Sequence, residues 1–407
     1  MVVLLKHVFS LRDFLAKLML FSCLRFVFAA FLTTGFAVSL STCAAGQRRV
    51  ESPAELRRVV KEVKPGDLLV LAGEVWMDAR LKIQLAGSAE KPITIRSDVT
   101  WSGESSFEII GNHVVLDGFV FTRGSLTSGH VMKVRGSHCR VTRCVFDHYN
   151  PAKRSTRYQW LSIFGHHHQV DHCRFSGQDH SGCSLVVWLE DDGGSEVGKH
   201  RIEANHFLDR PQGNGNGFET IRIGTSEYSM KWSQCVVSGN LFENCDGEVE
   251  LISNKSCGNV YHNNTIIGCA GALTLRHGND CKVLGNLILG DKDKNSGGIR
   301  VVGEGHEIVG NHIEGVGDRI GGAIALSAGV VNAELHQHAQ VRNVLIDRNA
   351  LIDNAGEEIV WGHGRGSHDR TLMPMNVTVS NTQRVEHVKL KRLRPVDVGP
   401  ETHKAGG

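Results

Sequence analysis

A short pattern of apolar and polar positions recurs along the chain. Each copy begins with an aliphatic residue or tyrosine, has a central residue (usually asparagine) three positions later, and ends two positions after that with an aliphatic residue or phenylalanine. Nine copies align: Val115-Gly118-Val120, Val141-Cys144-Phe146, Val170-Cys173-Phe175, Ile202-Asn205-Phe207, Val237-Asn240-Phe242, Tyr261-Asn264-Ile266, Val283-Asn286-Ile288, Ile308-Asn311-Ile313 and Ile346-Asn349-Leu351. Their central positions are 26, 29, 32, 35, 24, 22, 25 and 38 residues apart. Because this interval never falls below 22 residues but lengthens freely, the pattern indicates a solenoid whose loops accept insertions.

The segments around these copies favour strands over helices. They are rich in β-branched and aromatic residues, and they lack the longer leucine signature of leucine-rich repeats. Glycine accounts for 46 of the 407 residues and proline for only 8, a balance that suits many tight turns. We therefore predict an all-β chain folded as a single-stranded right-handed parallel β-helix. Coils in such a stack lie about 4.8 Å apart, so the central asparagines and cysteines should form ladders, and we interpret them as structural.

The first 45 residues have the character of a secretory signal peptide. Lys6, Arg12 and Lys17 precede an uncharged run over 26–40, and small residues follow it. The run is shorter than the roughly 20 residues needed to span a bilayer, so a membrane anchor is the weaker alternative. We expect a secreted or periplasmic protein with no stable membrane insertion after cleavage. Whether Cys43 carries a lipid is left open.

The mature chain, 46–407, is predicted to be one β-helix domain with a cap and a tail. Ser52-Pro53-Ala54-Glu55 has the form of a capping box with proline in the first turn, and it predicts a helix over 52–66. Such a helix would cover the open edge of the first coil. The C-terminal tail, 383–407, contains a basic run from His387 to Arg394 and is interpreted as a solvated tail or cap.

Charge and cysteine content narrow the chemistry. The chain has 45 basic and 43 acidic residues, and a net charge of +2 is too small for a nucleic-acid-binding protein. Nine of the 11 cysteines follow the expected signal peptide, and none has the spacing of a metal-binding C-x-x-C pair. Buried apolar cysteines are therefore favoured over a disulfide framework. The His166-His167-His168 run lies in the turn before a repeat strand, where a structural role is favoured over metal binding.

Four segments that follow repeat centres carry unusual charges. They read Gly217-Phe218-Glu219-Thr220-Ile221-Arg222-Ile223, Gly247-Glu248-Val249-Glu250-Leu251-Ile252, Gly271-Ala272-Leu273-Thr274-Leu275-Arg276-His277 and Gly298-Ile299-Arg300-Val301-Val302. Because they occur in consecutive turns, we expect them to stack as one sheet. Strand alternation places Glu248 and Glu250 on one face, with Val249 and Leu251 pointing into the core.

Two carboxylates this close repel each other unless a cation compensates, and oxygen donors are what Ca²⁺ prefers. Asn216, one coil earlier, could supply a third oxygen. Lys255 is expected just past the acidic strand, with Arg276 and His277 on the following coil and Arg300 on the coil after that. This concentration of both charge signs in three turns predicts a functional site.

With these residues the chain resembles polysaccharide lyase family 6, the β-helical group that contains alginate lyases and chondroitinase B. The resemblance runs from Pro53-Ala54-Glu55-Leu56 to Asp397-Val398-Gly399-Pro400 and is most specific over 248–277, which contains Glu-x-Glu-x4-Lys, Asn-Asn-Thr and Leu-Thr-Leu-Arg-His-Gly. It implies an enzyme that uses Ca²⁺ and acts on an anionic polysaccharide. The family's functional positions fall on catalytic Lys255 and Arg276, calcium ligands Asn216, Glu248 and Glu250, and substrate-binding His277 and Arg300.

The implied reaction is β-elimination in a uronic-acid polymer, which leaves a 4,5-unsaturated end. Alginate, as poly-mannuronate, is the favoured substrate, and a chondroitinase B-like dermatan sulfate lyase is the main alternative. A polyuronate C5-epimerase and a non-catalytic carbohydrate-binding solenoid are further alternatives. Preference for mannuronate or guluronate, endo or exo action, and the oligomeric state are left open.

Overall fold

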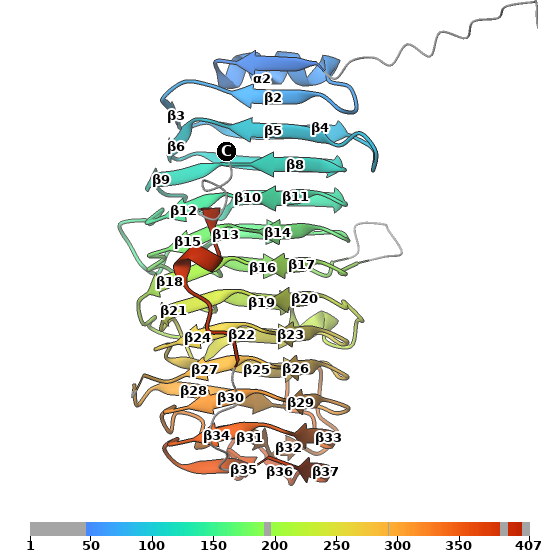
Figure 1. Cartoon of the computed structure of the whole chain (residues 1–407), viewed down its shortest axis with the longest axis vertical. Coiled ribbons are helices and arrows are strands. Elements are labelled where there is room, and N and C mark those ends of the chain that lie inside the picture. The colour runs from blue at the N-terminus through green and yellow to red at the C-terminus, as the bar shows by residue number, and fades with distance from the viewer. Residues whose placement is uncertain (1–45, 191–196, 292, 383–389, 401–407) are drawn as a thin grey trace, which may run out of the picture. The chain divides into compact units, whose positions relative to one another are not determined.

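The chain winds through three sheets in turn, and each strand pairs in parallel with the equivalent strand of the preceding coil (Figure 1). The computed structural model describes residues 46–190, 197–291, 293–382 and 390–400. The expected parallel β-helix is confirmed. The expected signal peptide, with Cys43, lies outside the described residues, as do 383–389 and 401–407 of the expected tail.

The three sheets run the length of the described β-helix. Sheet A consists of β1 (Gln47–Val50), β2 (Leu68–Leu71), β5 (Ile93–Ser97), β8 (Val114–Asp117), β11 (Arg140–Thr142), β14 (Gln169–Asp171), β17 (Arg201–Glu203), β20 (Val236–Ser238), β23 (Val260–His262), β26 (Lys282–Leu284), β29 (Glu307–Val309), β33 (Arg342–Asp347) and β37 (Met375–Ser380). Sheet B consists of β3 (Val75–Met77), β6 (Thr100–Gly103), β9 (Val120–Gly124), β12 (Val145–Asp147), β15 (Arg174–Ser176), β18 (His206–Arg210), β21 (Leu241–Cys245), β24 (Thr265–Ile267), β27 (Leu287–Leu289), β30 (His312–Glu314) and β34 (Ala350–Ile352). Sheet C consists of β4 (Arg80–Ala86), β7 (Ser106–Asn112), β10 (Gly129–Ser137), β13 (Tyr158–Ile163), β16 (Leu185–Val187), β19 (Ile221–Gly224), β22 (Glu250–Lys255), β25 (Gly271–His277), β28 (Ser296–Val301), β31 (Gly322–Ser327) and β35 (Glu357–His363). An antiparallel ribbon of β32 (Gly329–Val330) and β36 (Arg370–Leu372) and three 3₁₀ turns, η1 (Val60–Glu62), η2 (Ser226–Tyr228) and η3 (Pro395–Asp397), complete the described elements, together with α2 (Pro53–Val59).

The repeat residues form the core of the coils. Phenylalanine rings on five successive strands of sheet B stack nearly face to face, with centroids 4.8–5.3 Å apart, at Phe121, Phe146, Phe175, Phe207 and Phe242. This spacing follows from the separation of neighbouring strands. Because each ring is almost fully buried, each contributes about 1.5–3 kcal/mol to stability through removal of apolar surface from water.

The first copy of the repeat is one residue out of register with the prediction. In the structure it is Leu116-Phe119-Phe121 instead of Val115-Gly118-Val120, because Leu116 pairs with Val141 of the next coil. The three observed residues are buried, whereas the three predicted ones are only half-buried. Apolar residues occupy both faces of this strand, so the alternation alone allowed either register.

The central asparagines form the predicted ladder. From the second asparagine onward, each side-chain oxygen accepts hydrogen bonds from the backbone N–H and the Nδ2–H of the preceding asparagine, at 2.9–3.0 Å, along Asn205, Asn240, Asn264, Asn286, Asn311 and Asn349. All six are buried, and each Nδ2 also donates to a backbone carbonyl. The ladder therefore satisfies polar groups at the bend between sheets A and B.

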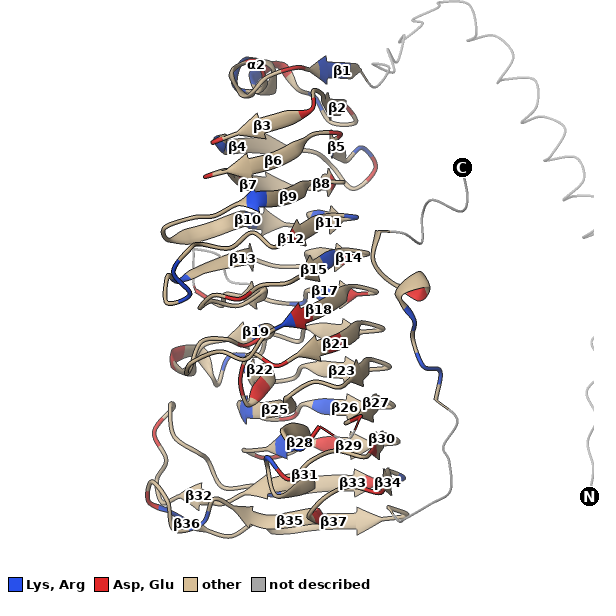
Figure 2. Ribbon diagram, turned by 90° about the vertical axis from the view of Figure 1, so that its left-hand side faces the viewer, with Lys and Arg blue, Asp and Glu red and all other residues tan. Residues whose placement is uncertain are grey.

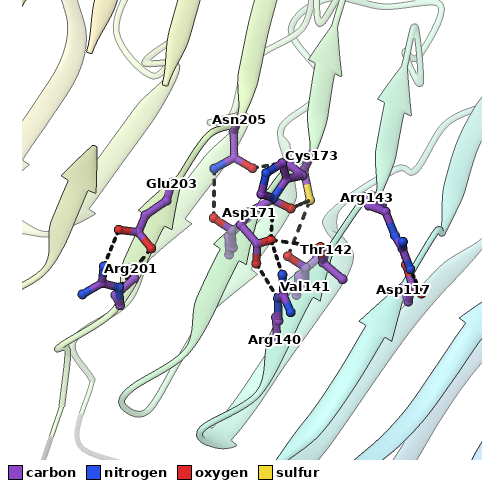
Figure 3. A network of polar contacts seen from close by, with 12 residues as sticks. Asp117, Arg140, Val141, Thr142, Arg143, Asp171, Cys173, Arg201, Glu203 and Asn205 are labelled. Atoms are coloured by element: carbon purple, nitrogen blue, oxygen red, sulfur yellow. Dashed lines mark hydrogen bonds and ion pairs between the residues drawn. The ribbon is translucent and has the colours of Figure 1, made fainter. Parts of the chain in front are cut away.

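Cysteines occupy the central position of two earlier coils, at Cys144 and Cys173, and ion pairs lie beside them. The nine cysteines in the described part of the chain are buried and form no disulfide, as predicted. Figure 3 shows the neighbouring polar network, in which Arg140 makes two hydrogen bonds of 2.7 Å to Asp171 on the next coil. Burial opposes ionisation of Asp171, but the bonds from Arg140 and His172 outweigh it and lower its pKa to about 2. These pairs fix neighbouring coils against each other.

The N-terminal helix caps the stack as predicted but is shorter than expected. The Ser52 hydroxyl accepts a hydrogen bond from the Glu55 N–H at 3.2 Å, and Leu56 is buried in the core. The helix ends at Val59 and tightens into η1 instead of continuing to residue 66. In Figure 1 α2 lies beyond β2 at the end of the stack.

Part of the expected tail, 390–400, lies against the side of the β-helix. The Leu393 N–H donates to Thr265 Oγ1 at 3.1 Å, the Gly399 N–H donates to the Ala204 carbonyl at 2.9 Å, and Val398 is fully buried. The basic side chains Lys391 and Arg392 remain exposed. No helix among the described residues is long and apolar enough to cross a bilayer.

Candidate active site

The four charged segments lie side by side in sheet C, as predicted. Strands β19, β22, β25 and β28 are consecutive neighbours, and charged positions of both signs gather along them (Figure 2). The pairing places Lys255 opposite His277. In the outward-facing row beside them, Ser253 pairs with Thr274 and Thr274 with Arg300.

Two local predictions about the acidic strand were wrong. Strand β22 begins at Glu250, so Glu248 lies in the bend before it, and Lys255 is the last residue of the strand instead of following it. Leu251 enters the main core, but Val249 packs against a separate small cluster beside the site. The reason is a β-bulge between Glu250 and Ile252, which interrupts the strict alternation.

A cavity of about 820 Å³ brings six of the seven predicted site residues together: Asn216, Glu248, Glu250, Lys255, Arg276 and His277. The seventh, Arg300, lines an adjoining cavity of about 580 Å³ that shares Val249, Glu250 and Arg276 with the first. The predicted residues thus form one continuous site over four coils, those of β19, β22, β25 and β28.

Glu248 has the most perturbed carboxyl group of the site. Burial, followed by repulsion from Glu219 and Glu250, raises its pKa to about 8, although the Gly217 N–H donates to it at 3.2 Å. A bound cation would relieve this repulsion, and Asn216, which lines the same cavity, has an amide oxygen that could serve as a further ligand. The donor set of Asn216, Glu248 and Glu250 therefore fits a hard oxygen-loving cation in charge and chemistry.

Glu250 already has cationic partners. Its Oε1 lies 3.1 Å from Arg300 Nη2 and 3.5 Å from Arg276 Nε, and the Ser253 hydroxyl donates to its Oε2 at 2.5 Å. Glu250 therefore orients the two arginines, and it would have to share its charge with them if it also held a metal ion.

Lys255 pairs with an acid that the sequence-based prediction did not select. Its Nζ lies 3.8 Å from Glu219 Oε1, and the Glu219 side chain is only 1% exposed. The same carboxylate accepts from the Cys183 thiol at 3.6 Å. Glu219 stands in the first of the four charged segments, so stacking that segment beside Glu250 was the available signal.

His277 is held neutral between cations. Burial, and then Arg276 and Lys255, lower its pKa to about 3. Arg276 Nη1 lies 3.3 Å from His277 Nδ1, and Ser226 Oγ lies 3.3 Å from Nε2. Because a guanidinium only donates, Nδ1 is the acceptor and Nε2 carries the proton. His277 therefore presents a hydrogen bond without a charge.

The adjoining cavity contains further basic residues that the prediction missed. His336, His338 and Arg370 line it, and Arg276 Nη2 donates to the His336 carbonyl at 3.2 Å. Burial and three arginines, Arg276 first, lower the pKa of His338 to about 2. His336 and His338 come from the segment after β32, and the 38-residue interval between the last two asparagine centres was the signal of that insertion. Arg370 comes from β36, beyond that interval.

Comparison with known proteins identifies the family. The sequence model of the family described as Chondroitinase B matches residues 50–392. The PL6 family alginate lyase AlyGC has 34% sequence identity and a TM-score of 0.78, over 82% of this chain and 47% of AlyGC. The chain belongs to polysaccharide lyase family 6.

Two further solved structures of family 6 lyases are also similar to this chain. A mannuronic acid specific lyase from human gut microbiota has 28% identity and a TM-score of 0.73, over 83% of this chain and 82% of the other. A PL6 alginate lyase in complex with a trisaccharide has 26% identity and a TM-score of 0.69, over 83% and 79% of the two chains. This family 6 chain spans about half the length of AlyGC. No curated protein gives a significant match.

Proposed function

We propose that this chain is a polysaccharide lyase that cleaves alginate, chiefly poly-mannuronate, by β-elimination. The observation that carries the proposal is the joint placement of Glu248, Lys255 and Arg276 on one cavity beside a second, basic cavity. Relatives that are alginate lyases, one of them mannuronic acid specific, support the choice of substrate. We further propose that the protein acts outside the cytoplasm, where such a polymer occurs.

The reaction removes the proton at C5 of a uronate and expels the glycosidic oxygen at C4. Lys255 is the proposed base, because it is the last residue of β22, lines the cavity and has a side chain that is still 16% exposed. The neutral amine accepts the C5 proton, and the neighbouring Glu219 carboxylate stabilises the resulting ammonium.

Arg276 is proposed to stabilise the departing oxygen. Burial, followed by repulsion from Arg300 and Arg370 and opposed by Glu250, lowers the pKa of Arg276, but a guanidinium remains a poor proton donor. It therefore acts by hydrogen bonding, with water as the proton source. His277 donates its Nε2–H toward the sugar or Ser226, and Arg300 pairs with a neighbouring sugar carboxylate.

Asn216, Glu248 and Glu250 are proposed to hold Ca²⁺. When bound, the ion would neutralise a uronate carboxylate and make the C5 proton more acidic. The main support for a bound cation is the raised pKa of Glu248, because burial and the neighbouring carboxylates leave its negative charge poorly compensated by the protein alone.

Dermatan sulfate is the alternative substrate that an observation favours. The basic residues of the second cavity, Arg300 and Arg370 among them, suit a sulfate as well as a carboxylate. Purified protein should be assayed with poly-mannuronate, poly-guluronate and dermatan sulfate by the ultraviolet absorbance of unsaturated uronate ends. Absorbing product from poly-mannuronate supports the proposal. Product from dermatan sulfate alone overturns the substrate assignment, and inverted uronates without absorbance would identify an epimerase.

The roles of Lys255 and the metal ligands need matched controls. We expect Lys255→Ala to abolish formation of unsaturated ends, whereas Lys282→Ala, an exposed lysine of β26 in sheet A, should leave the rate unchanged. EDTA should abolish activity, and Ca²⁺ should restore it. Full activity of Lys255→Ala would contradict the assignment of Lys255 as the base. Full activity in EDTA would contradict the assignment of Ca²⁺.

A further inference from the structure

A histidine cluster lies outside the proposed active site, at the turn from sheet C to sheet A. His113, His138 and His167 occupy equivalent positions on three consecutive coils, each in the left-handed backbone region with φ of 52–56°. Their rings stack with centroids 4.7 and 4.9 Å apart and interplanar angles of 7° and 15°. This stack follows from the coil spacing, which places equivalent side chains directly above one another.

His166 turns the stack into a convergent group. Its ring is almost perpendicular to those of His138 and His167, at 86° and 85°. Ring nitrogens of these three histidines all lie within 4.8 Å of one another, and His166 Nδ1 is 2.9 Å from His167 Nδ1. Among the described residues, these three histidines are the group of three or more histidine, cysteine or acidic side chains whose possible ligand atoms all lie this close together.

One of these separations already matches that of two imidazoles on one metal ion. With metal–nitrogen bonds of 2.0–2.1 Å, two ligand nitrogens lie about 2.9 Å apart at a right angle and about 3.3 Å apart at the tetrahedral angle. The pair of His166 and His167 is therefore already at ligand spacing, and a modest ring rotation brings the nitrogen of His138 into range. We propose that His138, His166 and His167 bind a divalent transition-metal ion, Zn²⁺ in particular, with water in the remaining position.

The third histidine of the run is excluded by its own hydrogen bonds. His168 is buried, its Nδ1 accepts from the Cys139 N–H at 3.0 Å, and its Nε2 donates to the Phe164 carbonyl at 2.8 Å. The site therefore takes two members of the run and one histidine from the preceding coil. Imidazole donors select Zn²⁺, Cu²⁺ or Ni²⁺ over Ca²⁺, so the site is chemically distinct from the proposed calcium site.

The backbone that carries the ligands is held firmly. The His138 N–H donates to the His166 carbonyl at 3.2 Å, and the His166 N–H donates to the Gly136 carbonyl at 3.1 Å. A Cβ at Gly165 would lie only 2.0 Å from that same carbonyl, so glycine is required for this close approach. A metal ion here would cross-link two coils. The coils are those of β10 and β13, whereas the proposed active site begins with β19.

The test is a titration of Zn²⁺ into the metal-free protein in the presence of excess Ca²⁺, with calorimetry as the readout. We expect one Zn²⁺ per chain and a rise in melting temperature with zinc. The variant pair His138→Asn and His167→Asn is chosen because asparagine tolerates a left-handed backbone. Each should weaken zinc binding at least about tenfold, since even loss of an outer partner costs 10–100-fold in affinity.

His148→Asn is the matched control, because His148 is exposed, also left-handed with φ of 46°, and lies on another bend. It should bind zinc like the parent protein. Replacing zinc with Co²⁺ should give the visible absorption of a tetrahedral nitrogen site, lost in both ligand variants. No zinc binding by the parent protein, or equal affinity in the variants and parent, overturns the proposal.

Discussion

Buried histidines should make the β-helix sensitive to mild acid, and His306 offers a sharp test. His306 is fully buried, its Nδ1 accepts from the Cys281 N–H at 3.1 Å, and its Nε2 donates to the Val302 carbonyl at 3.0 Å. Burial lowers its pKa to about 4, while its backbone hydrogen bonds oppose the shift. Protonation would place a second N–H against the Cys281 N–H, so the folded state resists it.

The direction and size of this effect of pH on stability follow from the difference in proton binding between the unfolded and the folded chain. As pH falls below about 6.5, the unfolded chain protonates this histidine, whereas the folded chain does so only near pH 4. Stability is therefore lost as pH falls through that window. Between pH 7 and pH 5 the loss from His306 is about 2 kcal/mol of the free energy of unfolding.

His306→Asn removes the titration but can keep the hydrogen bonds. Asn259 occupies the equivalent position two coils earlier, where its Oδ1 accepts from the Cys235 N–H at 2.7 Å and its Nδ2 donates to the Ser256 carbonyl at 3.2 Å. The smaller side chain leaves a void, whose cost is the same at both pH values.

The measurement is urea denaturation at pH 7 and pH 5, followed by circular dichroism. The variant should lose about 2 kcal/mol less between the two pH values than the parent protein. His148→Asn, at an exposed position, should retain the parent's pH dependence. If His306→Asn and the parent protein lose equal stability, burial of neutral His306 does not cause the acid sensitivity and the reasoning is refuted.

Three further predictions concern the ladder and the site. Asn264→Ala should lower stability by about 2–6 kcal/mol, because it leaves two donors of Asn240, the backbone N–H and one Nδ2–H, buried without an acceptor. An unchanged urea midpoint would contradict this. Glu219→Gln removes the carboxylate whose repulsion raises the pKa of Glu248 more than that of Glu250 does, so the acid limb of the pH–rate profile should move to lower pH. An unmoved limb would show that Glu248 does not govern it. Arg300→Ala should raise KM for the polymer about tenfold or more while changing kcat less, as expected for loss of a charged hydrogen bond to substrate. Steady-state kinetics in which kcat falls more than KM rises would place Arg300 in the chemical step instead.

The repeat pattern determined most of the fold. The period of at least 22 residues, set by a central asparagine between apolar positions, predicts the coils, the ladder and the stacking of the charged segments. These features were readable because each coil repeats the same local pattern, and parallel stacking then fixes its neighbours. The register of the first repeat was misread, because its apolar residues occupy both faces of the strand and only packing selects one.

The pairings within the site were decided by the tertiary structure. The sequence placed Glu248, Glu250, Lys255 and Arg276 on neighbouring coils, but a β-bulge and the long side chains determine their partners. Glu219 reaches Lys255 across coils, and the basic second cavity depends on an insertion about 60 residues beyond Arg276, near His336. Nothing in a local pattern specifies such contacts, because they depend on the distances between side chains that only the folded coil brings together.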